Sequence, residues 1–197
     1  MSKTRCLWCG EDPLYTAYHD KEWGVPVYED GLLFEFLILE TFQAGLSWIT
    51  ILRKRENFRT AFDRFDYAKI AAYDEDKFNE LLNDKGIVRN KLKINAAISN
   101  ARAFIKLQKE FGSFSDYIWG FVDKQPVENQ ITSHDQIPAN TNLSDKISKD
   151  LEKHGFKFVG TTVVYAFMQA TGMVNDHVTS CFRHDEIRDQ HMNLKKK

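Results

Sequence analysis

Apolar residues recur along this chain at the three-to-four-residue spacing of helices, and no convincing alternation of period two is present. The longest run, 90–111, carries apolar residues on one face and basic residues between them. Residues 32–43 are apolar almost without a break, and 161–171 are apolar on nearly all sides. The pattern predicts an all-α protein in which these last two helices are buried.

Helix-capping residues divide the pattern into segments. Asp12 followed by Pro13 is typical of a helix start. Asp30, Ser47, Asp66 and Asp74 also precede periodic runs and are expected N-caps, while glycines at 45 and 155 follow helix ends. Residues 123–142 form the one long polar connection. The expected helices begin near Pro13, Leu32, Trp48, Tyr67, Glu75, Asn90, Ser113, Asp145, Thr161 and Asn175.

Length and composition favour one folded unit. The chain has 197 residues, 43% of them hydrophobic and 13% aromatic, which excludes general disorder. We expect a single unit over 1–183 and a partly disordered tail over 184–197. No apolar stretch reaches membrane-spanning length, no secretory signal opens the chain, and three cysteines do not make a disulfide scaffold. These features predict a cytoplasmic protein, and nothing in them demands more than a monomer.

Charge is unevenly distributed despite a net value of −1. Seven basic and no acidic residues lie between 85 and 109, which leaves 20 basic against 28 acidic residues elsewhere. Such a segment is either the solvated face of a helix or a surface that contacts the phosphates of a nucleic acid. The basic residues are Lys85, Arg89, Lys91, Lys93, Arg102, Lys106 and Lys109.

Metal-type ligands lie at the two ends of the chain. Two cysteines and two histidines make a closed tetrahedral zinc site, which leaves no position for a reacting water and is therefore structural. If 177–181 is helical, its histidine and cysteine share one face. Two alternatives remain: these residues are ordinary core or surface positions, or Cys9 participates through the Cys-x-x-Cys spacing. The four residues considered are Cys6, His19, His177 and Cys181.

A glutamate lies on the face of 32–43 that should be buried. Helical spacing aligns Glu40 with Leu33, Phe36 and Leu37, whereas Glu35 is expected to point outward. A buried carboxylate needs either an ion-pair partner or a role in a binding pocket.

Aromatic residues are concentrated near this glutamate in the sequence. Each one alone is a normal core residue, but together with a buried carboxylate they suggest a cage for a flat ligand. Cation–π attraction would favour a positively charged ring in such a cage. The basic segment then makes a nucleobase flipped out of DNA the best hypothesis. The aromatic residues are Trp8, Tyr15, Tyr18, Trp23 and Trp48.

Several motifs resemble those of bacterial 3-methyladenine DNA glycosylase I. They are 14–26 (LYTAYHDKEWGVP), 43–50 (QAGLSWIT), 53–57 (RKREN), 155–161 (GFKFVGT) and 175–178 (NDHV). They occur in the family's order, and the resemblance covers about residues 5–182. It implies an all-α helix-hairpin-helix glycosylase fold and hydrolysis of the N-glycosidic bond of 3-methyladenine in alkylated double-stranded DNA, the first step of base excision repair.

The resemblance also implies roles for individual residues. Cys6, His19, His177 and Cys181 match the family's structural zinc ligands, with one zinc per chain, and Cys9 is not required. Glu40 matches the residue that accepts hydrogen bonds from the base, and it is the expected catalytic residue, which would also stabilise positive charge as the bond breaks. Tyr18 and Trp48 match pocket aromatics, and Tyr15, Trp8 and Trp23 match further lining or support.

The DNA-contacting residues follow from the same resemblance. Leu46 matches the wedge that replaces the flipped nucleotide, and 81–96 matches the hairpin that grips phosphate. Lys85, Gly86, Arg89 and Lys91 are the expected contacts, although the hairpin turn carries one glycine where the family pattern has two.

The implied substrate already carries positive charge, so its bond to the sugar is weak. Extrusion and selective binding can then do much of the work, with water as the nucleophile. No lysine is placed as a Schiff-base nucleophile, which predicts a monofunctional enzyme without strand cleavage. The alternative is a zinc-stabilised DNA-binding module without catalysis.

Overall fold

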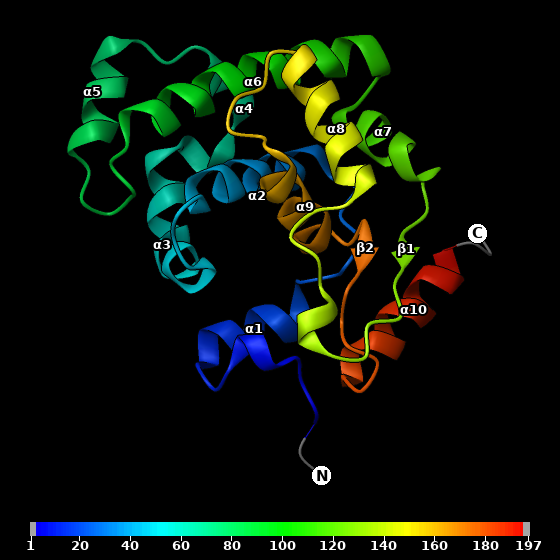
Figure 1. Ribbon diagram of the computed structural model, residues 1–197. Coiled ribbons are helices and arrows are strands. Elements are labelled where there is room, and N and C mark those ends of the chain that lie inside the picture. Colours follow the sequence, from blue (N-terminus) through cyan, green and yellow to red (C-terminus); the bar gives the residue numbers. More distant parts are fainter. Residues whose placement is uncertain (1–2, 195–197) are drawn as a thin grey trace.

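The chain folds around one central helix, α2 (Asp30–Gln43), in a computed structural model that describes residues 3–194 (Figure 1). Every α2 residue from Leu33 to Phe42 is buried. Helices α3, α6, α7 and α9 all pack against it. The predicted all-α class is therefore confirmed, and α2 is buried on all sides because it is apolar on all sides.

Helices dominate the described residues, and the one sheet has two strands of two residues each. Among these residues, no helix is both long and apolar enough to cross a membrane. The α-helices are α1 (Pro13–Lys21), α2, α3 (Trp48–Ala61), α4 (Tyr67–Ala71), α5 (Glu75–Asn83), α6 (Lys91–Phe111), α7 (Phe114–Trp119), α8 (Asn142–Lys153), α9 (Thr161–Ala170) and α10 (Phe182–Leu194). The 3-10 helices are η1 (Leu7–Cys9), η2 (Asp63–Phe65), η3 (Gly120–Val122) and η4 (His134–Gln136), and the strands are β1 (Val127–Glu128) and β2 (Val174–Asn175).

Local capping signals account for most helix starts. The carboxylates of Asp12, Asp66 and Asp74 accept hydrogen bonds from the first backbone amides of α1, α4 and α5, as expected. Ser47 occupies the cap position of α3, but its hydroxyl bonds to that of Thr50 instead of a backbone amide.

The expected cap of α2 is wrong by one residue. Glu29 caps the helix through the amides of Gly31 and Leu32, at 2.8 and 2.7 Å. Asp30 instead accepts from the amides of Phe114 and Ser115 at the start of α7, at 3.0 and 2.8 Å. Its carboxylate therefore joins two helices that are distant in sequence, which no local pattern reveals.

The C-terminal part differs from the expected helix near Asn175. Strand β2 occupies Val174–Asn175 and pairs in parallel with β1, with Val127 opposite Val174. Residues 176–181 follow as an irregular turn, so His177 and Cys181 do not lie on a helix. Helix α10 then covers most of the expected tail, and residues 195–197 lie outside the described part.

Candidate functional site

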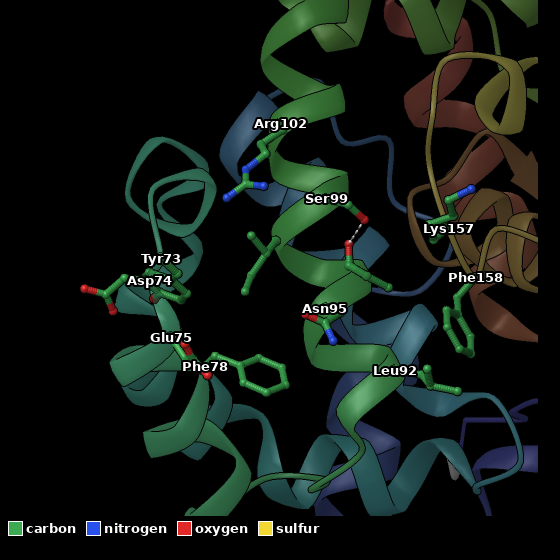
Figure 2. A pocket seen from close by; sticks show the side chains of 12 residues that line it. Tyr73, Asp74, Glu75, Phe78, Leu92, Asn95, Ser99, Arg102, Lys157 and Phe158 are labelled. Atoms are coloured by element: carbon green, nitrogen blue, oxygen red, sulfur yellow. Dashed lines mark hydrogen bonds between the residues drawn. The ribbon is translucent and has the colours of Figure 1, made fainter.

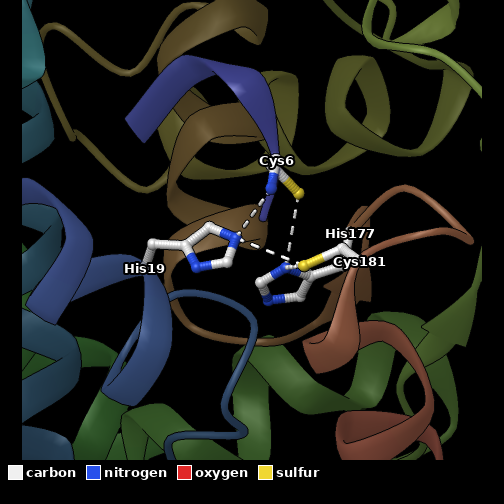
Figure 3. Close-up of side chains that lie close together, drawn as sticks. All are labelled: Cys6, His19, His177 and Cys181. Atoms are coloured by element: carbon white, nitrogen blue, oxygen red, sulfur yellow. Dashed lines mark hydrogen bonds between the residues drawn. The ribbon is translucent and has the colours of Figure 1, made fainter. Parts of the chain in front are cut away.

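Four buried side chains from the two ends of the chain meet at one point (Figure 3). Their ligand atoms all lie within 4.8 Å of one another, although Cys6 and His177 are 171 positions apart in the sequence. The Nδ1 atom of His177 is 3.5 Å from Cys6 Sγ and 3.6 Å from Cys181 Sγ, and Cys181 Sγ is 3.5 Å from His19 Nε2. The cluster can hold a metal ion and joins the N- and C-terminal segments.

Both imidazoles are oriented by their second nitrogen. His19 Nδ1 lies 2.8 Å from an Asp20 oxygen, and His177 Nε2 lies 3.0 Å from the Trp23 carbonyl. Because an oxygen acceptor lies beside His19 Nδ1 and beside His177 Nε2, each of these nitrogens carries the ring proton and donates it. The other nitrogen of each ring is then unprotonated and faces the cluster as an acceptor. Arg5 pairs with Asp20 at 2.8 Å, and this hydrogen bond is the main reason that the pKa of Asp20 is lowered to about 2.

Close packing around His177 depends on a glycine. Gly24 has a φ of +80°, and a Cβ at this position would lie 3.2 Å from the His177 ring. A side chain here would strain the backbone and press on the ring.

The two thiols of the cluster influence each other. The neighbouring thiol of Cys181 raises the pKa of Cys6, with burial as a second cause, and the thiol of Cys6 lowers the pKa of Cys181, which the two imidazoles lower further. Cys9 stands apart from this set, since its Sγ donates to the Cys6 carbonyl at 3.1 Å. The third cysteine therefore packs beside the cluster.

Glu40 faces a cavity of about 170 Å³. The residue is 3% exposed, and its Oε2 has no hydrogen-bond partner among residues 3–194. Burial raises the pKa of its carboxyl group to about 8. The ion-pair alternative for Glu40 is thus not realised among these residues, and a carboxyl oxygen remains available to a ligand.

The five aromatic residues singled out in the sequence all line this cavity. The ring centroids of Tyr18 and Trp48 lie 5.5 Å apart. The ring centroid of Trp8 lies 4.9 Å from that of Tyr15 and 5.0 Å from that of Trp23. The indole nitrogens of Trp8 and Trp48 are buried without a partner among the described residues. The cavity therefore combines flat apolar walls with a few unpaired polar atoms, which suits a flat heterocycle.

Sequence reasoning missed five residues that line the cavity. His134 and Ile137 come from η4 and the residue after it, in the long polar connection. That connection is fixed by β1 and by a 2.7 Å hydrogen bond from the Thr179 amide to the Ile131 carbonyl. Only tertiary pairing brings it over the cavity, so no local signal could have identified it. The missed residues are Gln43, His134, Ile137, Ala166 and Gln169.

Gln169 is held by a buried carboxylate. Its Nε2 donates to Asp176 at 2.7 Å, and Asp176 also accepts from the Tyr165 hydroxyl at 2.6 Å and the Asn129 amide at 2.6 Å. Asp176 is 0% exposed and directly precedes His177. The hydrogen bonds of Asp176 therefore connect the cavity wall to the metal-type cluster.

Glu35 is buried, contrary to the expectation that it points outward. It is 7% exposed and accepts hydrogen bonds from Arg55 Nε at 2.6 Å and Arg59 Nη2 at 2.7 Å. Arg55 also pairs with Glu22 at 2.6 Å. Because α3 covers the side of α2 that helical spacing leaves to solvent, two arginines distant in sequence neutralise the carboxylate.

The expected wedge lies on an exposed turn beside the cavity. Residues 44–47 are all exposed, and Leu46 itself is 41% exposed. Gly45, with a φ of +82°, provides the left-handed conformation that the turn requires, and the Leu46 amide closes it on the Gln43 carbonyl at 2.6 Å. Gln43 lines the cavity, so the turn starts at the cavity rim.

The expected hairpin consists of α5, the turn 84–90 and α6. The side chains of Lys85, Arg89 and Lys91 are exposed. Gly86 is held by hydrogen bonds from Lys54 Nζ, at 3.0 Å, and Asn57 Nδ2, at 3.2 Å, to its carbonyl. The basic segment is not uniform, because Lys93 is only 5% exposed and turns inward.

A larger cavity, of about 760 Å³, lies elsewhere, between α5, α6 and residues 157–158 (Figure 2). Both apolar and polar side chains line it, among them Phe78, Leu92, Arg102 and Phe158. No carboxylate in this lining is buried, since Asp74 and Glu75 are both exposed. The smaller cavity at Glu40 is therefore the better candidate for chemistry.

Comparison with known proteins identifies the family to which the chain belongs. The methyladenine glycosylase family model matches residues 8–184. The chain is 52% identical over 177 residues to DNA-3-methyladenine glycosylase 1 of Escherichia coli (strain K12), covering 90% of this chain and 95% of that protein. It is 44% identical over 178 residues to a DNA-3-methyladenine glycosylase of Haemophilus influenzae, and this match covers 90% of this chain and 96% of that protein.

Solved structures of 3-methyladenine DNA glycosylase I superpose closely on this chain. A crystal structure of a 3-methyladenine DNA glycosylase I superposes with a TM-score of 0.89 at 54% identity, covering 91% of this chain and 98% of that one. A structure of the Staphylococcus aureus enzyme, described as showing the structural basis of its 3-methyladenine recognition, superposes with a TM-score of 0.88 at 34% identity. This match covers 92% of this chain and 97% of that one.

Proposed function

The chain belongs to the methyladenine glycosylase family, and from that premise we propose that it is a DNA-3-methyladenine glycosylase. It would flip 3-methyladenine out of alkylated double-stranded DNA and hydrolyse the bond between base and sugar, as a step of base excision repair. The observation that carries this proposal is the unpaired, buried Glu40 carboxyl group in an aromatic cavity.

Base recognition would rest on shape and hydrogen bonding. Trp48 and Tyr18 offer adjacent ring surfaces on which a base can stack, with support from Tyr15, Trp8 and Trp23. Glu40 would accept a hydrogen bond from the amino edge of the base. Glu40 is also the only acidic residue lining the cavity among the described residues, and a bound base that carries positive charge would favour the ionised form of its carboxyl group, against the protonated form that burial favours.

Hydrolysis would use water and produce a free base and an abasic site. The bond to a positively charged base is weak, so extrusion, tight binding and the Glu40 carboxylate supply most of the required stabilisation. Among the described residues that line the cavity there is no lysine. A Schiff-base step would need one, so the proposal is a monofunctional enzyme that leaves the DNA strand intact.

We further propose that the cluster of Cys6, His19, His177 and Cys181 holds one structural zinc ion. A tetrahedral zinc with bonds of ~2.3 Å to sulfur and ~2.0–2.1 Å to nitrogen has sulfur–nitrogen edges of roughly 3.5 Å. Three of the four sulfur–nitrogen distances, at 3.5, 3.5 and 3.6 Å, fit this value. Four protein ligands close the coordination sphere, so the ion would stabilise the fold and hold the two chain ends together.

DNA would bind across the hairpin and the Leu46 turn. Lys85, Arg89 and Lys91 are exposed for phosphate contact, and Gly86 lies in the turn between the two helices of the hairpin. Leu46 would fill the gap left by the flipped nucleotide. The proposal treats 1–183 as one glycosylase unit that acts as a monomer in the cytoplasm.

The decisive experiment measures free 3-methyladenine released from methylated duplex DNA. The parent protein should release the base without cutting the strand, and Glu40→Gln should lower the rate at least tenfold while keeping its fold. Release by Glu40→Gln within a factor of two of the parent would remove Glu40 from the mechanism. No release by the parent, with DNA binding intact, would favour a DNA-binding module without catalysis.

A further inference from the structure

Lys93 is a buried lysine without a carboxylate partner among the described residues. It is 5% exposed, and its Nζ donates to two backbone carbonyls, Phe42 at 2.8 Å and Ala44 at 2.7 Å. Burial lowers the pKa of its ammonium group. Burying a charged group costs free energy that its hydrogen bonds must offset, and at Lys93 two backbone carbonyls supply those bonds.

The position of Lys93 is also unfavourable within its own helix. It is the third residue of α6, whose first turn carries the positive end of the helix dipole. Both acceptors lie instead at the C-terminal end of α2, where carbonyls lack helical partners and the dipole is negative. The last turn of α2 has no basic residue of its own, so Lys93 of α6 supplies the missing cap.

The residues that Lys93 holds lie directly before Leu46. Ala44 is the C-cap of α2 and the first residue of the exposed turn 44–47. Glu40 lies one half-turn of α2 before Phe42. The two hydrogen bonds from Lys93 therefore fix both the end of the helix that carries Glu40 and the start of the turn that carries Leu46.

The other side of Lys93 is the hairpin. Lys91 is two residues away on the exposed side of α6, and Asn90 caps the helix by accepting from the amides of Leu92 and Lys93. Lys54 makes a parallel connection, since its Nζ donates to the carbonyls of Lys85 and Gly86. Two lysines thus join the hairpin to α2 and α3 through backbone carbonyls.

We propose that Lys93 is a positioning residue for base extrusion, which fixes the Leu46 turn to the second helix of the hairpin. Phosphate contact by the hairpin and insertion of Leu46 are then made by one rigid unit. Without this connection the turn would have to be ordered during each encounter with DNA, at a cost in the extrusion step. The proposal rests on the glycosylase function proposed above.

The test compares Lys93→Met with the parent. Methionine keeps the buried aliphatic stem but has no donor. We expect excision from methylated duplex DNA to fall at least tenfold in kcat/KM, while the Kd for free 3-methyladenine, followed by tryptophan fluorescence, stays within twofold. Lys149→Met removes an exposed lysine of α8 and should change neither quantity.

A double-mutant cycle with Leu46→Ala separates positioning from general damage. If Lys93 acts through Leu46, the double variant should lose little more duplex activity than the more severe single variant. Lys93→Arg, which keeps a charge and several donors, should recover part of the activity and serves as the second variant if the methionine protein does not fold.

Three results would overturn the proposal while the parent remains active. In the first, Lys93→Met excises the base from duplex DNA within twofold of the parent. In the second, Lys93→Met loses as much affinity for the free base as it loses duplex activity, and in the third, the activity loss of the double variant equals the product of the losses of Lys93→Met and Leu46→Ala. A parent that releases no 3-methyladenine would instead overturn the glycosylase function itself.

Discussion

The indole ring of Trp23 packs edge-on against the imidazole ring of His177, with 4.6 Å between ring centroids. Trp8 similarly lies 5.3 Å from His19. Both tryptophans line the Glu40 cavity, and both histidines belong to the metal-type cluster. The aromatic wall of the cavity therefore rests directly on the cluster, and the order of one depends on the order of the other.

Loss of the metal should weaken base binding as well as stability. We expect Cys181→Ser to lose the ion, to melt at a lower temperature and to bind free 3-methyladenine at least fivefold more weakly, because His177 and Trp23 lose their fixed positions. Zinc content by elemental analysis, thermal unfolding and base titration measure the three effects. Cys9→Ser is the matched control and should leave about one zinc per chain, since the Cys9 thiol donates to the Cys6 and Gly10 carbonyls and is not part of the four-residue cluster. A stoichiometry near zero in freshly purified parent protein would contradict the assignment.

Local sequence signals accounted for much of the fold. Asp12, Asp66 and Asp74 cap helices as expected, because a side chain needs only its own backbone neighbours to do so. The burial of Glu40 followed from its spacing to Leu33 and Phe36 in the same helix. Such features depend on a few consecutive residues, and a single sequence contains all the information they require.

The failed predictions concern partners that are distant in sequence. Glu35 is buried because Arg55 and Arg59 reach it from α3, and Asp30 serves α7 instead of its own helix. His134 reaches the cavity only through the pairing of β1 with β2. None of these contacts leaves a periodic or capping signal, so neither the buried ion pairs nor the complete cavity lining could be predicted.

Removing the Glu35 carboxylate should destabilise the protein considerably. Glu35→Gln leaves the buried guanidinium of Arg55 without its buried carboxylate partner, with only the half-exposed Glu22 remaining, and loss of a buried charge partner typically costs about 3 kcal/mol or more. Urea unfolding should show a lower midpoint at an unchanged slope. Glu56→Gln is the control, because that side chain is 79% exposed and its pair with Arg59 should contribute less than about 1 kcal/mol. Similar midpoints for the two variants would show that the buried pairs do not stabilise the fold.

Substituting two lysines in the same turn of α6 should have different effects on the salt dependence of DNA binding. Lys91 is exposed at the hairpin, whereas Lys93 is buried and bonded to backbone carbonyls. Lys91→Ala should reduce the slope of log affinity for undamaged duplex DNA against log salt by about 1, the value for one lost phosphate contact. Lys93→Met should leave that slope unchanged. Fluorescence anisotropy at several salt concentrations measures both slopes, and equal changes in the two variants would mean that Lys93 contacts DNA directly.

The protonation of Glu40 should make the stability of the protein depend on pH. Burial raises the pKa of its carboxyl group from 4.5 to about 8, so between these values the folded protein holds a proton that the unfolded chain has released. The free energy of unfolding should therefore fall as pH rises through this window. Glu40→Gln has no such group and should gain stability relative to the parent between pH 5 and pH 9, by on the order of a few kcal/mol, since one pKa unit corresponds to about 1.4 kcal/mol. Urea unfolding at both pH values measures the difference, and Glu110→Gln, which removes an exposed carboxylate of α6, should follow the parent. Parallel pH profiles of Glu40→Gln and the parent would mean that burial does not raise the pKa of Glu40, and its carboxyl group would then not be the desolvated, unpaired acid that the cavity geometry indicates.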